Sequence, residues 1–260
     1  MHISFLDPYL HRRSPIHHLD SRIKLLLAVA FILTAALLPA GAWPVYILLF
    51  SLALAVEMLS ALGVVYVWKR SALALPFMLA ALPIVFLPGK ESAWVLFGVL
   101  PVAPDGLERF LSIAFKSWLS VQMAIVLASS TLFPDLLAAM RALRLPRLLV
   151  ALFGLMWRYL FVLVDEALRL IRARAARSGE SQGSRAGGDL LWRARVAGGM
   201  AGNLFLRAFD RSDRIYVAMM ARGYDGDIRA LPSPPLKRED WLILWFGLLL
   251  LGAFLLLSTL

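Results

Sequence analysis

Arginines that close two long predicted helices are the side chains best placed for specific polar chemistry. The first helix starts near Arg147 and ends in Ala176-Arg177-Ser178; the second starts near Leu190 and ends in Ala221-Arg222-Gly223, where the glycine is a natural stop. A cation at a helix C-terminus complements the helix dipole, so either arginine alone is ordinary. Two such ends in one segment predict two equivalent sockets on a partner, where each guanidinium can bind a carboxylate through two hydrogen bonds.

The second helix also carries a basic stripe and an apolar band. At about 100° per residue, the arginines of Arg207–Gly226 fall on one face, and its methionines and aromatic residues form a band of their own. The supporting contact positions that this pattern predicts are Arg207, Arg211, Arg214, Tyr216, Met219 and Met220. Attraction to anionic lipid is the alternative, because it needs only charge. The position of Arg222, directly before a glycine, favours docking to a protein.

Two glycines predict where the two long helices cross. Gly198 and Gly202 lie four residues apart, each beside an alanine. Small residues at this spacing share one helical face and let a second helix approach closely. We therefore expect the crossing at these glycines. On the first helix, Asp165 and Arg169 are expected to form an ion pair, because residues four apart are neighbours on a helix.

The histidines raise the question of a metal site. All four, His2, His11, His17 and His18, lie in the N-terminal leader. Imidazole is a common ligand of transition metals. The chain has no cysteine to accompany them, and the leader's aspartates are equally suited to capping helices. The sequence therefore predicts no metal site and no bound cofactor in this chain.

Two patterns typical of enzymes lack the structural context that they need. Gly179–Gly183 matches G-x-S-x-G, but that turn requires a strand before it and a helix after it, whereas this one lies in a polar linker over 178–189. Lys90 follows a glycine, yet no glycine five residues earlier completes a phosphate-binding loop. The sequence therefore predicts that the chain is not an enzyme, has no catalytic residues and does not hydrolyse ATP itself.

The elements that position these residues are unusually apolar. Of the 260 residues, 60% are hydrophobic, and the mean hydropathy is +0.75, whereas soluble domains are nearer half apolar. The formal net charge is +10. In so apolar a chain, basic residues indicate cytoplasmic loops and contact with anionic membrane lipid, and not a nucleic-acid partner.

Five apolar stretches are long enough to cross about 30 Å of hydrocarbon. They lie near 23–40, 44–63, 71–88, 107–132 and 241–259. A sixth run, 148–164, is shorter and contains Arg158. Of the 27 Lys and Arg residues, 18 lie between 133 and 240, and the positive-inside rule puts that segment and the N-terminus in the cytoplasm. Because a crossing at 148–164 would place the arginines outside, we expect that run to lie on or just beneath the membrane.

We therefore predict an all-α polytopic membrane protein with about five transmembrane helices and two long crossing cytoplasmic helices. The leader and four spans occupy 1–132, the cytoplasmic segment 133–240 and the last span 241–260.

Polar residues inside predicted spans are functional candidates. Ser112, Lys116 and Ser120 share one helical face, which we expect to contact another membrane subunit. Glu57 lies near the cytoplasmic end of its span, where it either has such a role or simply reaches the interface.

Two blocks give the chain a family resemblance. The leader segment Ser14–Lys24 is similar to the N-terminal motif of the CbiQ family, although Ser21 stands where proline is expected. Arg207–Gly226 closely resembles that family's C-terminal signature. CbiQ proteins are the transmembrane, or T, components of energy-coupling factor (ECF) transporters for cobalt, and the resemblance extends over nearly the whole chain.

The resemblance implies a permease subunit that carries no chemistry of its own. The two helix ends would dock on two ATP-binding-cassette ATPase subunits (CbiO-like). Their ATP hydrolysis would drive cobalt uptake through a separate substrate-binding membrane subunit (CbiM-like, with or without a CbiN-like subunit). The expected location is the bacterial inner (plasma) membrane. The same role in a nickel or vitamin transporter is the alternative; a stand-alone secondary carrier would need repeated halves and polar residues at the membrane midplane.

Overall fold

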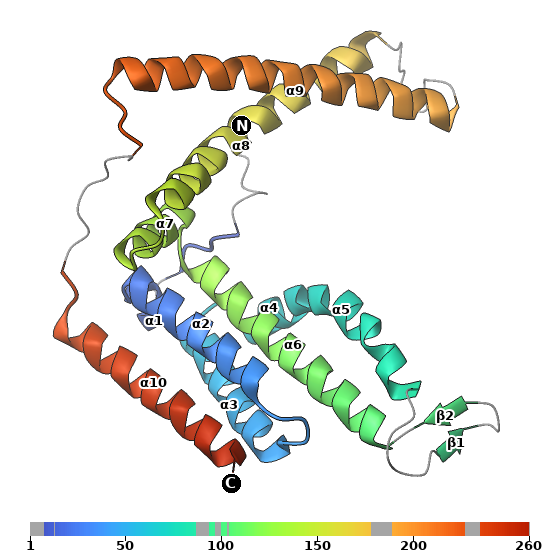
Figure 1. Ribbon diagram of the computed structural model, residues 1–260, viewed down its shortest axis with the longest axis vertical. Coiled ribbons are helices and arrows are strands. Elements are labelled where there is room, and N and C mark those ends of the chain that lie inside the picture. The colour runs from blue at the N-terminus through green and yellow to red at the C-terminus, as the bar shows by residue number, and fades with distance from the viewer. Residues whose placement is uncertain are drawn as a thin grey trace. The chain divides into compact units, whose positions relative to one another are not determined.

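Figure 1 shows a computed structural model that describes residues 8–12, 14–86, 94–96, 100–102, 104–177, 189–226 and 235–259. The helices are α1 (Pro15–His18), α2 (Ser21–Leu37), α3 (Trp43–Leu59), α4 (Val64–Ser71), α5 (Leu75–Ala80), α6 (Pro104–Ser130), α7 (Phe133–Ala142), α8 (Arg147–Arg177), α9 (Leu190–Ala221) and α10 (Arg238–Thr259). Two short strands, β1 (Trp94–Leu96) and β2 (Leu100–Val102), pair antiparallel. The chain divides into two compact units, Arg144–Pro232 and His2–Leu143 with Ser233–Leu260. We call them the helix pair and the membrane unit.

The membrane unit is built around α6. This helix packs against α2, α3 and α4, while α10 packs against α2 and α3 (Figure 1). Phe31, Tyr46, Leu49 and Leu119 are fully buried between these helices. The outward side chains of α2 and α10 are also apolar, which is the pattern of helices surrounded by lipid.

The third predicted span is a helix in pieces. After α4 come a 3₁₀ turn over Ala72–Ala74, then α5, then a second 3₁₀ segment over Leu82–Phe86. Pro76 and Pro83 lie inside this stretch. Proline has no amide hydrogen to donate to the preceding turn, and 3₁₀ turns are a common way to continue past such a break. Taken together, Val64–Phe86 is still long and apolar enough to cross a membrane.

The predicted fold class, an all-α polytopic membrane protein, is confirmed. By length and composition, four helical segments of the described chain can cross a bilayer: Val64–Phe86, Asp105–Ser130, Arg147–Arg177 and Arg238–Ser258. At 17 residues, α3 is shorter but also apolar. Because α8 belongs to this group, the placement of 148–164 outside the bilayer stays a prediction, as do the predicted segment boundaries.

The leader is fixed to the C-terminal end of α6. The Leu10 amide donates to the carbonyl of Ser129 at 3.0 Å. The ammonium group of Lys24 is buried and donates to the carbonyls of Ser130 (3.1 Å) and His17 (3.3 Å). A cation at this position complements the dipole of α6. Lys24 thereby joins the start of α2, the leader and the end of α6.

The helix pair has almost no buried interior. Among its described residues only Ala151, on α8, is buried, and α9 has no buried residue. The side chain of Asp189 accepts a hydrogen bond from the amide of Leu190 at 2.7 Å and so caps the start of α9. The two helices cross in Figure 1, and polar contacts hold them there.

Candidate functional site

A glycine turn sets the position of Arg222. Gly223 has φ of +77°, a conformation that favours glycine. Its amide donates to the Met220 carbonyl at 3.0 Å, and the amide of Tyr224 donates to the Met219 carbonyl at 3.1 Å. This pair of bonds is a Schellman motif, which satisfies the last carbonyls of α9. The predicted stop at Gly223 is confirmed, and the turn fixes the backbone that carries Arg222.

Arg222 lies at the rim of a groove between α8 and α9. The groove has a volume of about 820 Å³ and is lined by Arg158 and Tyr159 from α8 and by Met219 and Tyr224 from the other side. Arg222 itself is exposed. A planar, permanently charged guanidinium in this position can bind a carboxylate of another protein bidentately.

Arg177 is the last residue of α8 and lines a second groove. This groove has a volume of about 1000 Å³ and lies between the C-terminal half of α8 and the N-terminal half of α9. The guanidinium of Arg174 stands 5.9 Å from the centre of the Trp192 ring, which joins its walls through a cation–π contact. Ser178, the third residue of the predicted motif, lies outside the described residues.

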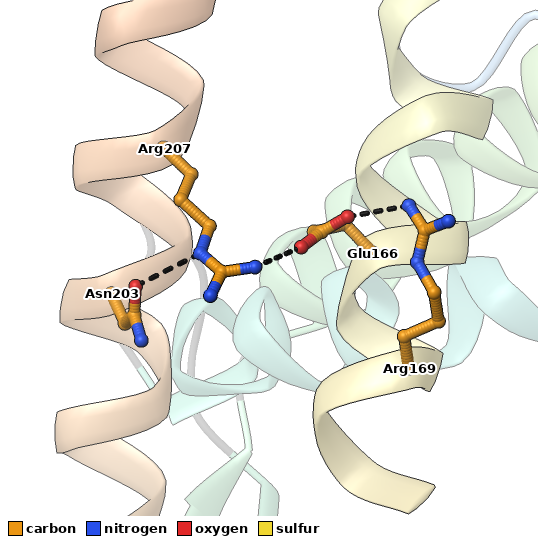
Figure 2. A network of polar contacts seen from close by, with 4 residues as sticks. All are labelled: Glu166, Arg169, Asn203 and Arg207. Carbon is orange, nitrogen blue, oxygen red and sulfur yellow. Dashed lines mark hydrogen bonds and ion pairs between the residues drawn. The ribbon is translucent and has the colours of Figure 1, made fainter. Parts of the chain in front are cut away.

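A carboxylate that the sequence analysis missed joins the two helices (Figure 2). Glu166 on α8 accepts one hydrogen bond from Arg207 of α9 and one from Arg169 of α8, both at 2.5 Å. The Nε of Arg207 also donates to the Asn203 side chain at 3.1 Å. The predicted pair of Asp165 with Arg169 is therefore wrong. On a helix, the positions three and four residues away are both neighbours, and Glu166 is selected because it also faces α9.

These contacts change how the basic stripe is understood. Arg207 binds Glu166 within the chain. Arg211 and Arg214 line a smaller cavity of about 310 Å³ beside the same carboxylate. The apolar band divides as well: Met219 faces the groove toward α8, whereas Tyr216 and Met220 are exposed. Their contact with a partner stays a prediction.

The expected crossing at Gly198 and Gly202 does not match the structure. A side chain at either glycine would meet no described atom within 4 Å beyond the neighbouring backbone of α9 itself, so no second helix of the described chain approaches closely there. The helices are joined instead at Glu166 and Arg207. Small residues permit a close approach but do not impose one, and here a charged contact between long side chains holds the helices.

The polar face of α6 serves the chain's own α2–α3 loop. Lys116 donates to the Leu38 carbonyl at the end of α2. The hydroxyl of Ser112 is buried and accepts from the Gly41 amide at 3.2 Å. Gly41 has φ of +86°, and a side chain there would meet the carboxylate of Glu108. Contact of Ser112, Lys116 and Ser120 with a second subunit stays a prediction.

Glu57 is enclosed by the protein and is not exposed at its surface. Its side chain is 1% exposed, and neither carboxylate oxygen has a hydrogen-bond partner among the described residues. The amide group of Gln122 on α6 is equally buried and also lacks a partner there. A polar residue in a predicted span was the signal that could have singled out Gln122.

His17 makes structural contacts in the leader. Its Nδ1 lies 2.7 Å from the Ser14 hydroxyl and its Nε2 lies 3.1 Å from the Leu10 carbonyl. A carbonyl can only accept, so Nε2 carries the proton and Nδ1 accepts from the serine. Burial lowers the pKa of His17 below its ordinary value. Among the described residues no three His, Asp or Glu side chains are grouped as a metal site; His2 lies outside them.

Comparison of the sequence with known proteins identifies one family. A family model described as cobalt transport protein, CbiQ, matches residues 12–233. The energy-coupling factor transporter transmembrane protein EcfT of Lacticaseibacillus paracasei is 28% identical over 98% of both chains. The cobalt transport protein CbiQ of Rhodobacter capsulatus is 29% identical over 60% of this chain and 62% of its own length. An uncharacterized protein of Methanocaldococcus jannaschii is 24% identical over 95% of this chain and 84% of its own. Since the family model covers most of the sequence, the chain belongs to the CbiQ family, the transmembrane component of energy-coupling factor transporters.

Proposed function

We propose that this chain is the permease subunit of an ECF transporter that couples ATP hydrolysis by two partner ATPase subunits to the uptake of cobalt ions. A separate substrate-binding membrane subunit would capture the ion. The proposed setting is the bacterial inner membrane, with the N-terminus and the helix pair in the cytoplasm.

The observation that carries this proposal is the pair of exposed arginines at the ends of α8 and α9. Each ends a long helix that has little burial of its own, and Arg222 is held by a Schellman turn. A rigid helix with a cation at its end can bind a pocket on a partner subunit and be displaced by that subunit as one rigid body. Two such helices in one chain suit two ATPase subunits.

Cobalt is proposed over other cargoes because the family description and the Rhodobacter relative are both named for cobalt transport. The EcfT relatives name no cargo. Uptake of cobalt and nickel, each competed against the other in cells that carry the chain with its genomic neighbours, separates the two ions.

The docking role is tested by the double variant Arg177→Glu with Arg222→Glu. Each hydrogen bond to a charged group contributes about 1.5–3 kcal/mol, so reversing both charges should abolish both retention of the ATPase subunits and metal uptake. The matched control is Arg172→Glu with Arg195→Glu, which changes the net charge equally on the same two helices. Both control residues are exposed and line none of the three cavities described above.

Equal loss in the control would point to a general attraction to lipid. Full assembly and transport by the double glutamate variant would contradict the two-socket mechanism. Membrane insertion should be the same in both variants, and a quantitative blot of the membrane fraction checks it.

A further inference from the structure

The junction of α8 and α9 rests on one carboxylate. Both oxygens of Glu166 are occupied by arginines, Arg207 from α9 and Arg169 from α8. The Glu166 side chain is 13% exposed, whereas those of Arg207 and Arg169 are 54% and 60% exposed. Arg207 is held in turn by Asn203 one turn earlier on α9. Figure 2 shows Glu166 and Arg207 meeting between the two helices, with Arg169 and Asn203 beside them on their own helices.

Little apolar burial holds the angle between these helices. Among the described residues α9 has no buried side chain and α8 has only Ala151. Open grooves lie along the pair, one of about 1000 Å³ that includes Arg177 and one of about 820 Å³ that includes Arg222. Charge-assisted bonds from planar guanidinium groups fix direction as well as distance.

The junction also lies between the two arginine ends. At 1.5 Å per residue, Glu166 is about 16 Å from Arg177 along α8, and Arg207 is about 22 Å from Arg222 along α9. A rotation of about 10° at the junction would therefore displace Arg222 by about 4 Å. A fixed junction transmits movement of one end to the other, whereas a loose junction lets each helix move alone.

We propose that Glu166, held by Arg207 and Arg169, is the positioning residue that locks the crossing of α8 and α9 and so makes the two arginine ends move together. This proposal rests on the proposed function, in which those ends dock on ATPase subunits. It assigns to Glu166 no contact with ATP, metal or partner.

The first test measures the crossing directly in the purified full-length chain. The chain has no cysteine, so Arg172→Cys on α8 and Val217→Cys on α9, both exposed, can carry two nitroxide labels. In lipid nanodiscs the distance distribution between them should be narrow. Glu166→Gln should broaden it, because an amide leaves two arginines without their counter-charge. Asp165→Asn, the same change one residue away at an exposed position, should leave it narrow.

The second test asks for rescue. In the charge-swap variant Glu166→Arg with Arg207→Glu, the pair across the helices is restored in reverse, so the distribution should narrow again. An unchanged distribution in Glu166→Gln, or equal broadening in Asp165→Asn, would overturn the proposal.

The third test measures coupling in the assembled transporter. Glu166→Gln should retain its ATPase subunits and hydrolyse ATP, while the metal taken up per ATP falls about five- to tenfold. The charge swap should recover much of this ratio. Broadened distances with an unchanged ratio would overturn the coupling role. The proposed function fails separately, through the Arg177 and Arg222 variants, which leave the Glu166 junction intact.

Discussion

The membrane unit and the helix pair place their apolar side chains in opposite ways. In the membrane unit, Phe31 and Leu49 are at most 1% exposed, in one contiguous core. On α9, Phe205, Phe209 and Val217 are each at least 60% exposed. The membrane unit therefore holds itself together by packing, whereas the helix pair is held by polar contacts and leaves its apolar surface for lipid or protein.

The basic side chains of the two regions also differ in whether the described residues of their own unit supply their hydrogen-bond partners. Lys24 and Lys116 donate to backbone carbonyls of their own unit and close its helix ends. Arg177 and Arg222, at the C-terminal ends of α8 and α9, are exposed beside grooves. Basic side chains thus satisfy backbone carbonyls in one region and are left exposed in the other.

The first test asks which side of the membrane each of the two regions faces. Single cysteines replacing Ala40, Ala61 or Ala194, all exposed, would be treated in intact cells with a membrane-impermeant thiol reagent. We expect complete labelling at 40 and none at 61 or 194, because the positive-inside rule puts the arginine-rich helix pair in the cytoplasm. Labelling at 194 from outside would mean that α8 crosses the bilayer.

A second test compares truncation of one large apolar side chain in each region. Leu49→Ala leaves a cavity in a closed core and should lower the free energy of unfolding by about 2–5 kcal/mol. Phe209→Ala, on an exposed face, should change it by no more than about 0.5 kcal/mol while weakening retention of partner subunits. Unfolding in mixed detergent micelles measures the first and co-purification the second. An equal loss of stability would show that the helix pair has a core of its own.

The third test replaces one basic residue in each region by methionine: Lys24, which donates to the carbonyl at the end of α6, and Arg222, at the end of α9. Lys24→Met leaves the carbonyls of Ser130 and His17 without their donor, at a cost of about 1–3 kcal/mol to the isolated chain. Arg222→Met should leave the isolated chain unchanged and lower only the retention of the ATPase subunits. Destabilisation of the isolated chain by Arg222→Met would show that its partner lies within the chain.

The sequence was sufficient for the features that local rules decide. Long apolar runs and the stop at Gly223 follow from hydropathy and from the conformational freedom of glycine. The break at Pro76 and Pro83 could also have been anticipated, because proline interrupts helices.

Pairings between distant residues could not be read in this way. Asp165 and Glu166 are both acceptable neighbours of Arg169, and only the position of α9 decides between them. The contacts of Ser112 and Lys116 with the α2–α3 loop could not be predicted either, since periodicity does not reveal that this loop folds back onto them. The glycines at 198 and 202 allow another helix to approach closely, but they do not determine where α8 crosses α9.

The smallest effect concerns the leader and depends on pH. Burial lowers the pKa of His17 below its ordinary value of 6.5, so the unfolded leader binds a proton more readily than the folded one. The contribution of neutral His17 to the stability of the folded leader is therefore complete above pH 6.5 and declines as the pH falls below that value. Protonation of Nδ1 also removes the acceptor that the Ser14 hydroxyl uses. Exchange protection of the Leu10 amide, corrected for the intrinsic rate, should drop between pH 7.5 and 5.5. His17→Gln should remove this pH dependence, whereas His18→Gln, at an exposed position, should keep it. The reverse result would show that His18, and not His17, is the group whose protonation loosens the leader.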